Sequence, residues 1–432
     1  MNKNYIFNFS LLISIFLIIS NIISFIYRYS KMPVWLNLFQ GSVLFIILLY
    51  LILLHISKEP LFDKSFFSRA MIVFSFISKG LIAIINEHIA ILPDLSDVSY
   101  YNNLALDFAR ENVVQGSGLG ASGFANYFIG NIYLLLGNSS LVVSLINSFL
   151  YSITIIYIIK ICFEFKILNP WPAAFIAAFM PSSILYIPVL LRESAFLFIS
   201  ILFFYRLVIL YNCKIGGIKN HSVVLAYLFL ATFIRPQVFP IYSLIYVLSL
   251  IYFYRGIVRV SAIFTIVVFL FVISISNFKL FLFIDSNLLN LYYFQLYRNA
   301  FSDLPNAYLV NIVYKDWFDF ITYIPRFLIH YLFAPYPWES SNYKYFMATL
   351  DAIFSFIILV SSLLIIISNL KIFKNKIFQG AISFLILTVP FAIIEAYPMG
   401  AVRHRMIVLL LMLPIFSFIL PMNIDKFKKM NN

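Results

Sequence analysis

The chain has 432 residues, of which 63% are hydrophobic and only 11% are charged. Soluble domains carry roughly 25% charged residues, so this composition excludes an ordinary water-soluble globular protein. Apolar runs close to the ~20 residues needed to cross a bilayer recur from end to end. They predict an all-α, polytopic membrane helical bundle that forms a single transmembrane domain over residues 1–432.

The first apolar run, from Ile6 to Tyr27, is too long for the core of a cleaved signal peptide. Arg28, Lys31 and Pro33 follow it in place of a small-residue cleavage site, so we interpret it as a retained span. The sequence predicts roughly twelve spans in all. They are Ile6 to Tyr27, Val34 to Ile56, Ala70 to His88, Leu141 to Ile161, Trp171 to Leu190, Ser194 to Tyr211, Ser222 to Ile234, Gln237 to Tyr254, Val260 to Phe283, Phe346 to Leu370, Ile377 to Tyr397 and Met406 to Leu420.

Basic residues recur at alternate ends of these spans, and the formal net charge of the chain is +13. Because cytoplasmic loops of membrane proteins are enriched in Lys and Arg, this bias predicts orientation rather than binding to nucleic acid. Both termini are then cytoplasmic, and the expected location is the bacterial inner membrane. Lys79 is the main charged residue expected within a span.

Two loops on the outer, periplasmic side are long enough to hold structure, one over residues 89–140 and one over 284–345. Each contains an apolar piece too short to cross, Phe124 to Leu136 and Trp317 to Phe333, which we expect to lie along the membrane interface or dip into it. The glycine-rich run from Gln115 to Gly123 predicts a flexible joint.

Asp94 and Asp97, just outside the third span, are the first candidates for chemistry. A carboxylate pair at a membrane surface can supply a general base and an orienting group or metal ligand. The alternative is a Pro-Asp helix cap, with Asp97 at the start of the next helix. The neighbouring Tyr100 and Tyr101 are either interfacial anchors or lining for a sugar site, where a ring packs on a pyranose while its hydroxyl forms a hydrogen bond.

Arginines at predicted outer span ends are candidates for binding phosphate, because a guanidinium can grip it with two hydrogen bonds. Arg192 precedes Glu193 in an apolar stretch, where the alternative is a solvated ion pair. Arg235 precedes Pro236, and its alternative is snorkelling to the headgroups. Arg403 and Arg405 flank His404 just before the last predicted span, as outward charges that either hold a diphosphate or pair with Glu395.

In the second outer loop, Arg298 and the run from Ala334 to Glu339 form an aromatic, partly charged element. Trp338 is either an interfacial belt residue or a substrate contact, and Glu339 offers a second carboxylate. His88, His330 and His404 lack the spacing of a zinc site, and no nucleotide-binding glycine motif is present. No metal site or other cofactor is assigned, and a divalent metal stays open.

Several of these motifs together resemble the GT-C superfamily of polytopic glycosyltransferases. They are the outer Ser-Asp-x-x-Tyr-Tyr-x-x-Leu-Ala segment at 96–105, the Arg-Glu junction at 192–193, the Arg-Pro turn at 235–236, the Ala-Pro-x-Pro-Trp element at 334–338 and the Arg-x-Arg at 403–405. The resemblance is carried by the set, since each motif is weak singly.

The resemblance implies a polyprenyl-phosphate or polyprenyl-diphosphate sugar donor, a glycan or lipid-linked acceptor, and an active site on the first large outer loop. It implies that Asp97 is the base that activates the acceptor hydroxyl and that Asp94 supports it. Arg192, Arg235, Arg403 and Arg405, with Arg298 added from the second loop, are then the donor phosphate ligands. Tyr100, Tyr101, Trp338 and Glu339 are expected to contact substrate.

The chain departs from the family in having two extra spans before the loop. It also lacks the strict Asp-Glu pair of protein O-mannosyltransferases and the soluble C-terminal domain of oligosaccharyltransferases, which argues against a protein acceptor. Its size, spans and loops also resemble O-antigen polymerases, which join lipid-linked repeat units. A lipid-linked oligosaccharide flippase is the alternative that is not an enzyme, but a transporter would gather ionisable residues at mid-membrane in two related halves.

Overall fold

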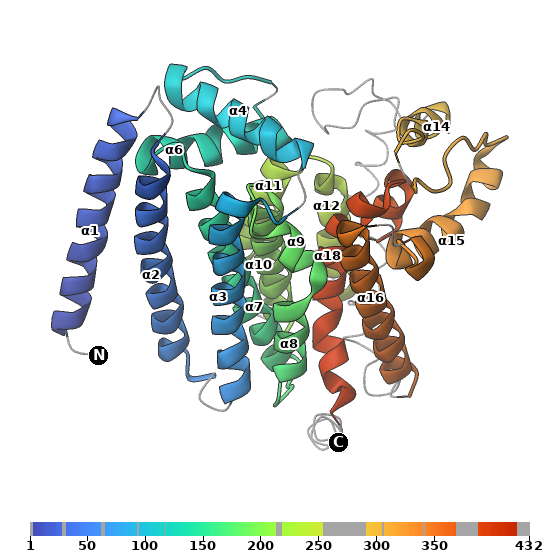
Figure 1. The fold of residues 1–432 in the computed structure, drawn as a ribbon. Coiled ribbons are helices and arrows are strands. Elements are labelled where there is room, and N and C mark those ends of the chain that lie inside the picture. Colours follow the sequence, from blue (N-terminus) through green and yellow to red (C-terminus); the bar gives the residue numbers. More distant parts are fainter. Residues whose placement is uncertain are drawn as a thin grey trace. The chain divides into compact units, whose positions relative to one another are not determined.

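The computed structural model (Figure 1) describes residues 3–27, 32–61, 65–92, 95–116, 118–212, 218–253, 291–304, 306–339, 342–368 and 388–420. Within these ranges every regular element is a helix, which confirms the predicted all-α class. Six of the described helices are long and apolar enough to cross a membrane, and three shorter apolar helices accompany them. The predicted count of roughly twelve spans stays a prediction.

The chain divides into two compact units. Unit 1 contains residues 1–156, 184–199 and 233–235, and unit 2 contains residues 157–183, 200–232 and 236–432. Helices α7 (Ser140–Glu164), α9 (Pro181–Tyr186), α10 (Glu193–Asn212) and α11 (Ile218–Ile234) each have residues in both units. The two units are described separately below.

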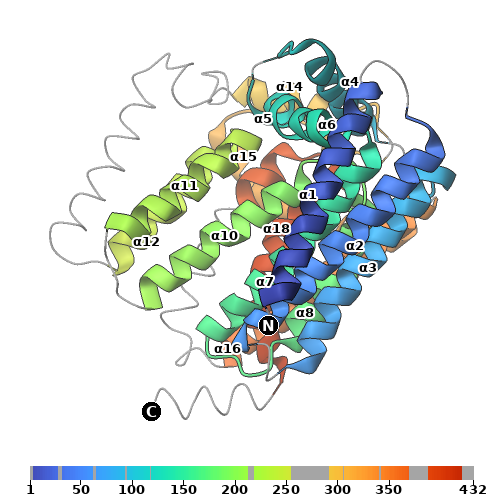
Figure 2. The ribbon, with the colours of Figure 1, turned by 90° about the vertical axis from the view of Figure 1, so that its left-hand side faces the viewer.

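Unit 1 begins with α1 (Lys3–Ile26), α2 (Val34–Lys58) and α3 (Phe66–Ile89), which match the first three predicted spans. Helices α2 and α3 lie side by side in both ribbon views (Figures 1 and 2). The ring of Phe45 stacks on Phe76, with centroids 5.0 Å apart, and a Cβ at Gly80 would meet the Phe45 ring. Small residues at such contacts let apolar helices approach closely.

Much of the first predicted outer loop is helical. It contains α4 (Ser96–Glu111), α5 (Gly120–Gly123), the π-helix η2 (Phe124–Ile129) and α6 (Gly130–Leu136). Helix α4 packs on η2 and α6, and in Figure 1 it lies at a steep angle to α2 and α3 rather than running along them. The predicted apolar piece Phe124 to Leu136 is therefore helical, although its position relative to a membrane stays a prediction.

The predicted span from Trp171 to Leu190 contains two short helices instead of one continuous helix. Helix α8 (Trp171–Phe179) stops at Met180, whose ψ of 122° is not helical, and α9 (Pro181–Tyr186) follows. The residue before a proline is pushed out of the helical region, so Pro181 accounts for the break. Helix α12 (Val238–Phe253) agrees with the predicted span Gln237 to Tyr254.

The rest of unit 2 contains α14 (Leu291–Asn299), α15 (Trp317–Phe333), the short 3-10 turn η4 (Pro337–Glu339), α16 (Tyr343–Ser368), α18 (Pro398–Phe416) and η5 (Ser417–Ile419). Helices α15, α16 and α18 pack on one another around a core that includes Phe327, Tyr331 and Ala401. The last helix begins at Pro398 and not at Met406 as predicted, so Arg403, His404 and Arg405 lie inside it.

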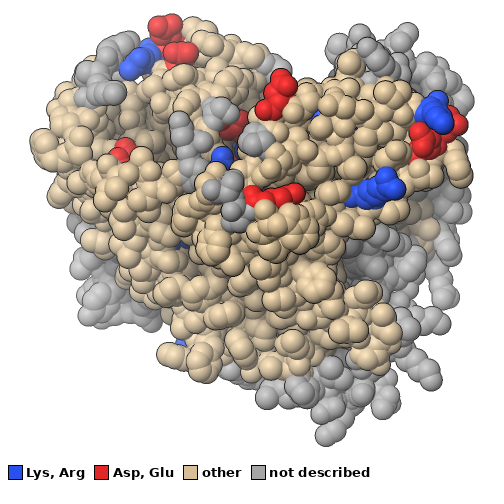
Figure 3. Space-filling model, turned by 45° about the vertical axis from the view of Figure 1, so that its right-hand side comes forward, with Lys and Arg blue, Asp and Glu red and all other residues tan. Residues whose placement is uncertain are grey.

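Some predictions fall outside the described residues: the span Val260 to Phe283, most of the span Ile377 to Tyr397, and Asp94. On the face drawn in Figure 3, uncharged residues make up most of the described surface. That surface agrees with the coarse conclusion that the chain is a membrane protein built from apolar helices.

Candidate functional site

Helix α4 supplies the first side chains of the candidate site. Its buried face follows the helical period and contains Tyr101, Leu104, Ala105 and Ala109. Asp97 lies in its first turn, half-buried, where the positive end of the helix dipole favours a carboxylate. The alternative interpretation is correct in placing Asp97 at the start of the next helix. The Pro-Asp cap that it also invokes lies outside the described residues.

The two tyrosines of α4 that were predicted as site residues differ in their exposure to solvent. Tyr100 is 49% exposed, whereas Tyr101 is 3% exposed and has its ring edge-on to Phe124 of η2, with centroids 6.4 Å apart. The backbone that leads into η2 is tight, because a Cβ at Gly123 would overlap the carbonyl oxygen of Gly118. Tyr101 is therefore fixed between α4 and the π-helix, a helix type that often occurs at functional sites.

A turn before α10, called here the α10 turn and comprising residues 189–194, supplies the next group. Asn147 of α7 is fully buried, and its Nδ2 donates to the carbonyl oxygens of Val189 (2.7 Å) and Leu191 (3.0 Å). Arg192 Nη1 donates to the carbonyl oxygen of Ile234 at 3.0 Å. These three hydrogen bonds fix the position of the backbone before α10 and the direction of the Arg192 side chain.

Glu193 and Arg235 form a buried ion pair. Arg235 Nη2 lies 2.6 Å from Glu193 Oε1, and the two side chains are 5% and 3% exposed. The guanidinium also lies over the ring of Phe196, 4.8 Å from its centroid. The solvated Arg192–Glu193 pair that the sequence offered as an alternative is therefore wrong, because Glu193 is buried and has a partner 42 residues away.

Four charged groups act on the Tyr101 phenol. Burial raises the pKa of Tyr101 to about 12, and smaller electrostatic effects come from Arg192, Glu193, Asp97 and Arg235 in that order. The two arginines lower the pKa and the two carboxylates raise it. Tyr101 thus remains a protonated hydrogen-bond donor at neutral pH, and the predicted residues Asp97, Arg192 and Arg235 lie within electrostatic range of its hydroxyl.

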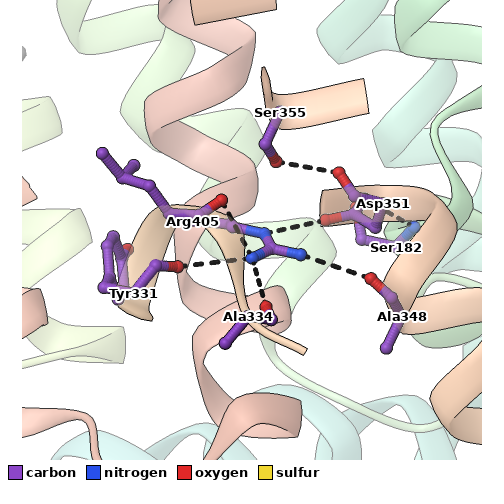
Figure 4. A network of polar contacts seen from close by, with 8 residues as sticks. Ser182, Tyr331, Ala334, Ala348, Asp351, Ser355 and Arg405 are labelled. Carbon is purple, nitrogen blue, oxygen red and sulfur yellow. Dashed lines mark hydrogen bonds and ion pairs between the residues drawn. The ribbon is translucent and has the colours of Figure 1, made fainter. Parts of the chain in front are cut away.

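Arg405 in unit 2 is a correction, because it is fully buried rather than outward-facing. Figure 4 shows its guanidinium held by Asp351 Oδ2 at 2.9 Å and by backbone carbonyl oxygens, among them those of Ala334 at 2.6 Å and Ala348 at 3.4 Å. The carbonyl oxygens of Tyr331 and Leu332 accept as well. Protein acceptors occupy the arginine, so we remove it from the set of phosphate ligands.

Arg298 is likewise a structural residue. It is 1% exposed, and its guanidinium lies over the ring of Phe327, 4.3 Å from the centroid. Its nitrogens donate to backbone carbonyl oxygens of Leu309, Tyr308, Ala392, Ile393 and Glu395, at distances from 2.8 to 3.5 Å. The prediction that Arg298 binds donor phosphate has no support from this environment.

The other predicted residues of unit 2 have contacts of their own. Trp338 is 80% exposed and stacks on Tyr336 with centroids 5.0 Å apart, while Glu339 Oε2 accepts from the Tyr336 backbone N–H. Glu395 pairs with His404, Nδ1 to Oε2 2.8 Å, rather than with an arginine as the sequence suggested. Arg403 is half-buried on the same helix.

Sequence reasoning missed Asp351, Asn147 and the Glu395–His404 pair. Asp351 could have been found from the sequence, because it is a carboxylate inside the apolar run of α16 and such a charge needs a buried partner. Nothing local distinguished Asn147 from any other polar residue in a span. Among the described residues, no three His, Cys, Asp or Glu side chains gather as metal ligands.

No family model, curated protein or solved structure matches the chain.

Proposed function

We propose that the chain is a membrane-embedded glycosyltransferase that transfers sugar from a polyprenyl-phosphate or polyprenyl-diphosphate donor to a glycan or lipid-linked acceptor. The observation that carries the proposal is the convergence of Asp97, Arg192, Glu193 and Arg235 on Tyr101 within unit 1. A carboxylate and an arginine that share one site supply the base and the phosphate ligand that this reaction needs. The proposed setting is assembly of a surface polysaccharide such as O-antigen or capsule.

The proposed reaction is a displacement at the anomeric carbon. Asp97 accepts the proton of the acceptor hydroxyl, the hydroxyl oxygen forms the new glycosidic bond, and the bond from the anomeric carbon to the phosphate oxygen breaks. The electron pair leaves with the polyprenyl phosphate or diphosphate, whose charge Arg192 stabilises. Tyr101, protonated at neutral pH, donates a hydrogen bond to substrate.

The proposed topology places this site on the periplasmic side of the bacterial inner membrane. It retains roughly twelve spans, cytoplasmic termini and two outer loops over residues 89–140 and 284–345. The six described long helices support the membrane part of the proposal. Orientation and the remaining spans rest on the distribution of Lys and Arg along the sequence.

The test is a deletion strain complemented with Asp97→Asn, read by gel analysis of surface polysaccharide and by immunoblot of the membrane fraction. General-base catalysis contributes about 10²–10⁴-fold in rate, so the variant should lose its glycan product at normal protein level. Asp107→Asn is a matched control on the same helix, because Asp107 Oδ2 accepts from Gln115 Nε2 (2.9 Å) on the exposed side.

The product pattern also separates the neighbouring functions. A ladder reduced to one repeat unit identifies a polymerase, a uniform small mobility shift identifies single-sugar transfer, and inward-facing lipid carrier that accumulates identifies a flippase. Normal product from Asp97→Asn would remove Asp97 from the mechanism and with it the proposed active site.

A further inference from the structure

The α10 turn carries two buried donor atoms that its other contacts leave unused, one on Arg192 just before the helix and one on Ser194, the second residue of the helix. Ser194 is 1% exposed, and its Oγ is buried without a hydrogen-bond partner. The Nε of Arg192 is also buried without a hydrogen-bond partner, while Nη1 of the same side chain donates to the carbonyl oxygen of Ile234. A buried donor without an acceptor costs about 1–3 kcal/mol, so two that lie two residues apart in one turn call for an explanation.

The position of these donors is fixed by the surrounding protein. Asn147 holds the carbonyl groups of Val189 and Leu191, so the α10 turn cannot rotate away. Side chains in a helix tilt toward its N-terminus, which directs the Ser194 hydroxyl to the end where Arg192 leaves the chain. The first N–H groups of a helix also lack carbonyl partners within it, and they point the same way.

The charge of this turn favours an anion. Glu193 would oppose one, but Arg235 neutralises it at 2.6 Å. Arg192 and the positive end of the 20-residue helix α10 then dominate the local field. A helix N-terminus with an arginine and a buried hydroxyl is the arrangement that proteins use to bind phosphate groups.

We propose that the α10 turn is a preformed seat for one phosphate group of a phosphate or diphosphate ester, in direct contact with Arg192 and Ser194. This inference rests on the proposed function, which it deepens by dividing the work of two arginines. Arg192 binds the anion, whereas Arg235 is a positioning residue that acts by neutralising Glu193. Asn147 is a positioning residue as well, because it fixes the turn without facing the ligand.

Binding of inorganic pyrophosphate and of farnesyl diphosphate to the full chain, purified in an uncharged detergent, tests the seat without any sugar transfer. Ser194→Ala should weaken both by about tenfold or more, since a hydrogen bond to a charged group is lost. Arg192→Lys should weaken both similarly because the guanidinium geometry is lost. Ser148→Ala is the matched control, because its Oγ bonds only within α7, to the Ser144 carbonyl at 2.9 Å.

Asn147→Leu adds a readout for positioning. It should weaken pyrophosphate binding although residue 147 contributes no group to the anion, and Asn147→Gln should fail to rescue it. Unchanged pyrophosphate affinity in Ser194→Ala, or an equal loss in Ser148→Ala, would overturn the seat. Binding to farnesol as tight as to farnesyl diphosphate would do the same, because it would assign the affinity to the isoprenoid.

The source of the phosphate is separated by repeating the titration in nanodiscs. If phosphatidylglycerol displaces pyrophosphate competitively in the wild type and not in Ser194→Ala, the seat exists and takes a lipid headgroup. Normal pyrophosphate binding together with a chain that makes no glycan would disprove the proposed function while the seat stands.

Discussion

Replacing Asp351 or Arg405 should destabilise unit 2, because each residue neutralises the charge of the other in an apolar core. Both side chains are fully buried and 2.9 Å apart. Breaking a buried ion pair by removing one partner costs about 3–5 kcal/mol, because the other charge is left without compensation. In the wild type, Asp351 Oδ1 accepts a hydrogen bond from the Ser182 backbone N–H at 3.0 Å. Asp351→Asn keeps an oxygen for this bond, so only the charge is lost.

Arg405→Met should cost more than Asp351→Asn. The arginine also occupies the carbonyl groups of Tyr331, Leu332 and Ala334, at and just after the end of α15. Each buried acceptor left without a donor adds about 1–3 kcal/mol. The double variant Asp351→Leu/Arg405→Met removes both charges but not the orphaned carbonyl groups, so it should be more stable than Arg405→Met and less stable than wild type.

Thermal unfolding in detergent measures these differences if a maleimide dye reports the thiol of Cys162, which is fully buried in α7. A Cys213→Ser background leaves Cys162 as the only thiol, since the chain has 2 cysteines. Asp351→Asn should lower the midpoint by on the order of 10 °C. An Arg405→Met midpoint equal to that of wild type would refute the reasoning, and so would a double variant less stable than Arg405→Met.

Four further substitutions test the candidate site. Burial keeps the Tyr101 phenol protonated until about pH 12. In the unfolded chain its pKa is about 10, so stability should fall between these values, by on the order of 2–3 kcal/mol. Tyr101→Phe should lack this alkaline loss in a denaturation series, and an identical pH profile would contradict it. Gly123→Ala places a Cβ against the Gly118 carbonyl group and should reduce glycan output, because the neighbouring η2 carries the Phe124 contact to Tyr101. Gly130→Ala should reduce glycan output less, because the nearest atoms to its Cβ belong to the Phe108 side chain. Glu193→Gln should raise the affinity for pyrophosphate severalfold by removing a negative charge from the α10 turn, and weaker binding would contradict the assigned charge balance.

The sequence predicts the spans of this chain well in α2, in α7 and also in α3, although Lys79 lies within α3. It fails where a proline breaks a run, as Pro181 does, and where a charge interrupts one, as in α18. The last span is predicted to begin only at Met406, after the charged cluster, because an unpaired arginine is too costly inside a membrane helix. Its partner Asp351 is 54 residues away, and no local pattern reveals that pairing.

The grouping of Asp97, Arg192 and Arg235 was predictable for a different reason. The predicted topology, which depends only on run length and the distribution of Lys and Arg, puts all three at predicted outer span ends. The contacts inside the group were not predictable. Glu193 pairs with Arg235 rather than with its neighbour Arg192, and that choice depends on how the turn at Ile234 packs against the α10 turn in unit 1.

The arginines of this chain show how a buried cation with a structural task differs from one available to a ligand. Arg298 and Arg405 give all three nitrogens of their guanidinium groups to oxygen acceptors of the protein, mostly backbone carbonyl groups at helix ends. Arg192 has one such bond and a buried Nε with no acceptor. Because leaving a buried donor unpaired destabilises the folded state, a sequence optimised for stability alone would fill that position with an acceptor or an apolar side chain. Arg206 has a buried Nε of the same kind, so it is the combination with the buried Ser194 hydroxyl in the same turn that favours Arg192 as a ligand-binding residue. That combination is a property of the folded contacts that the one-letter sequence does not carry.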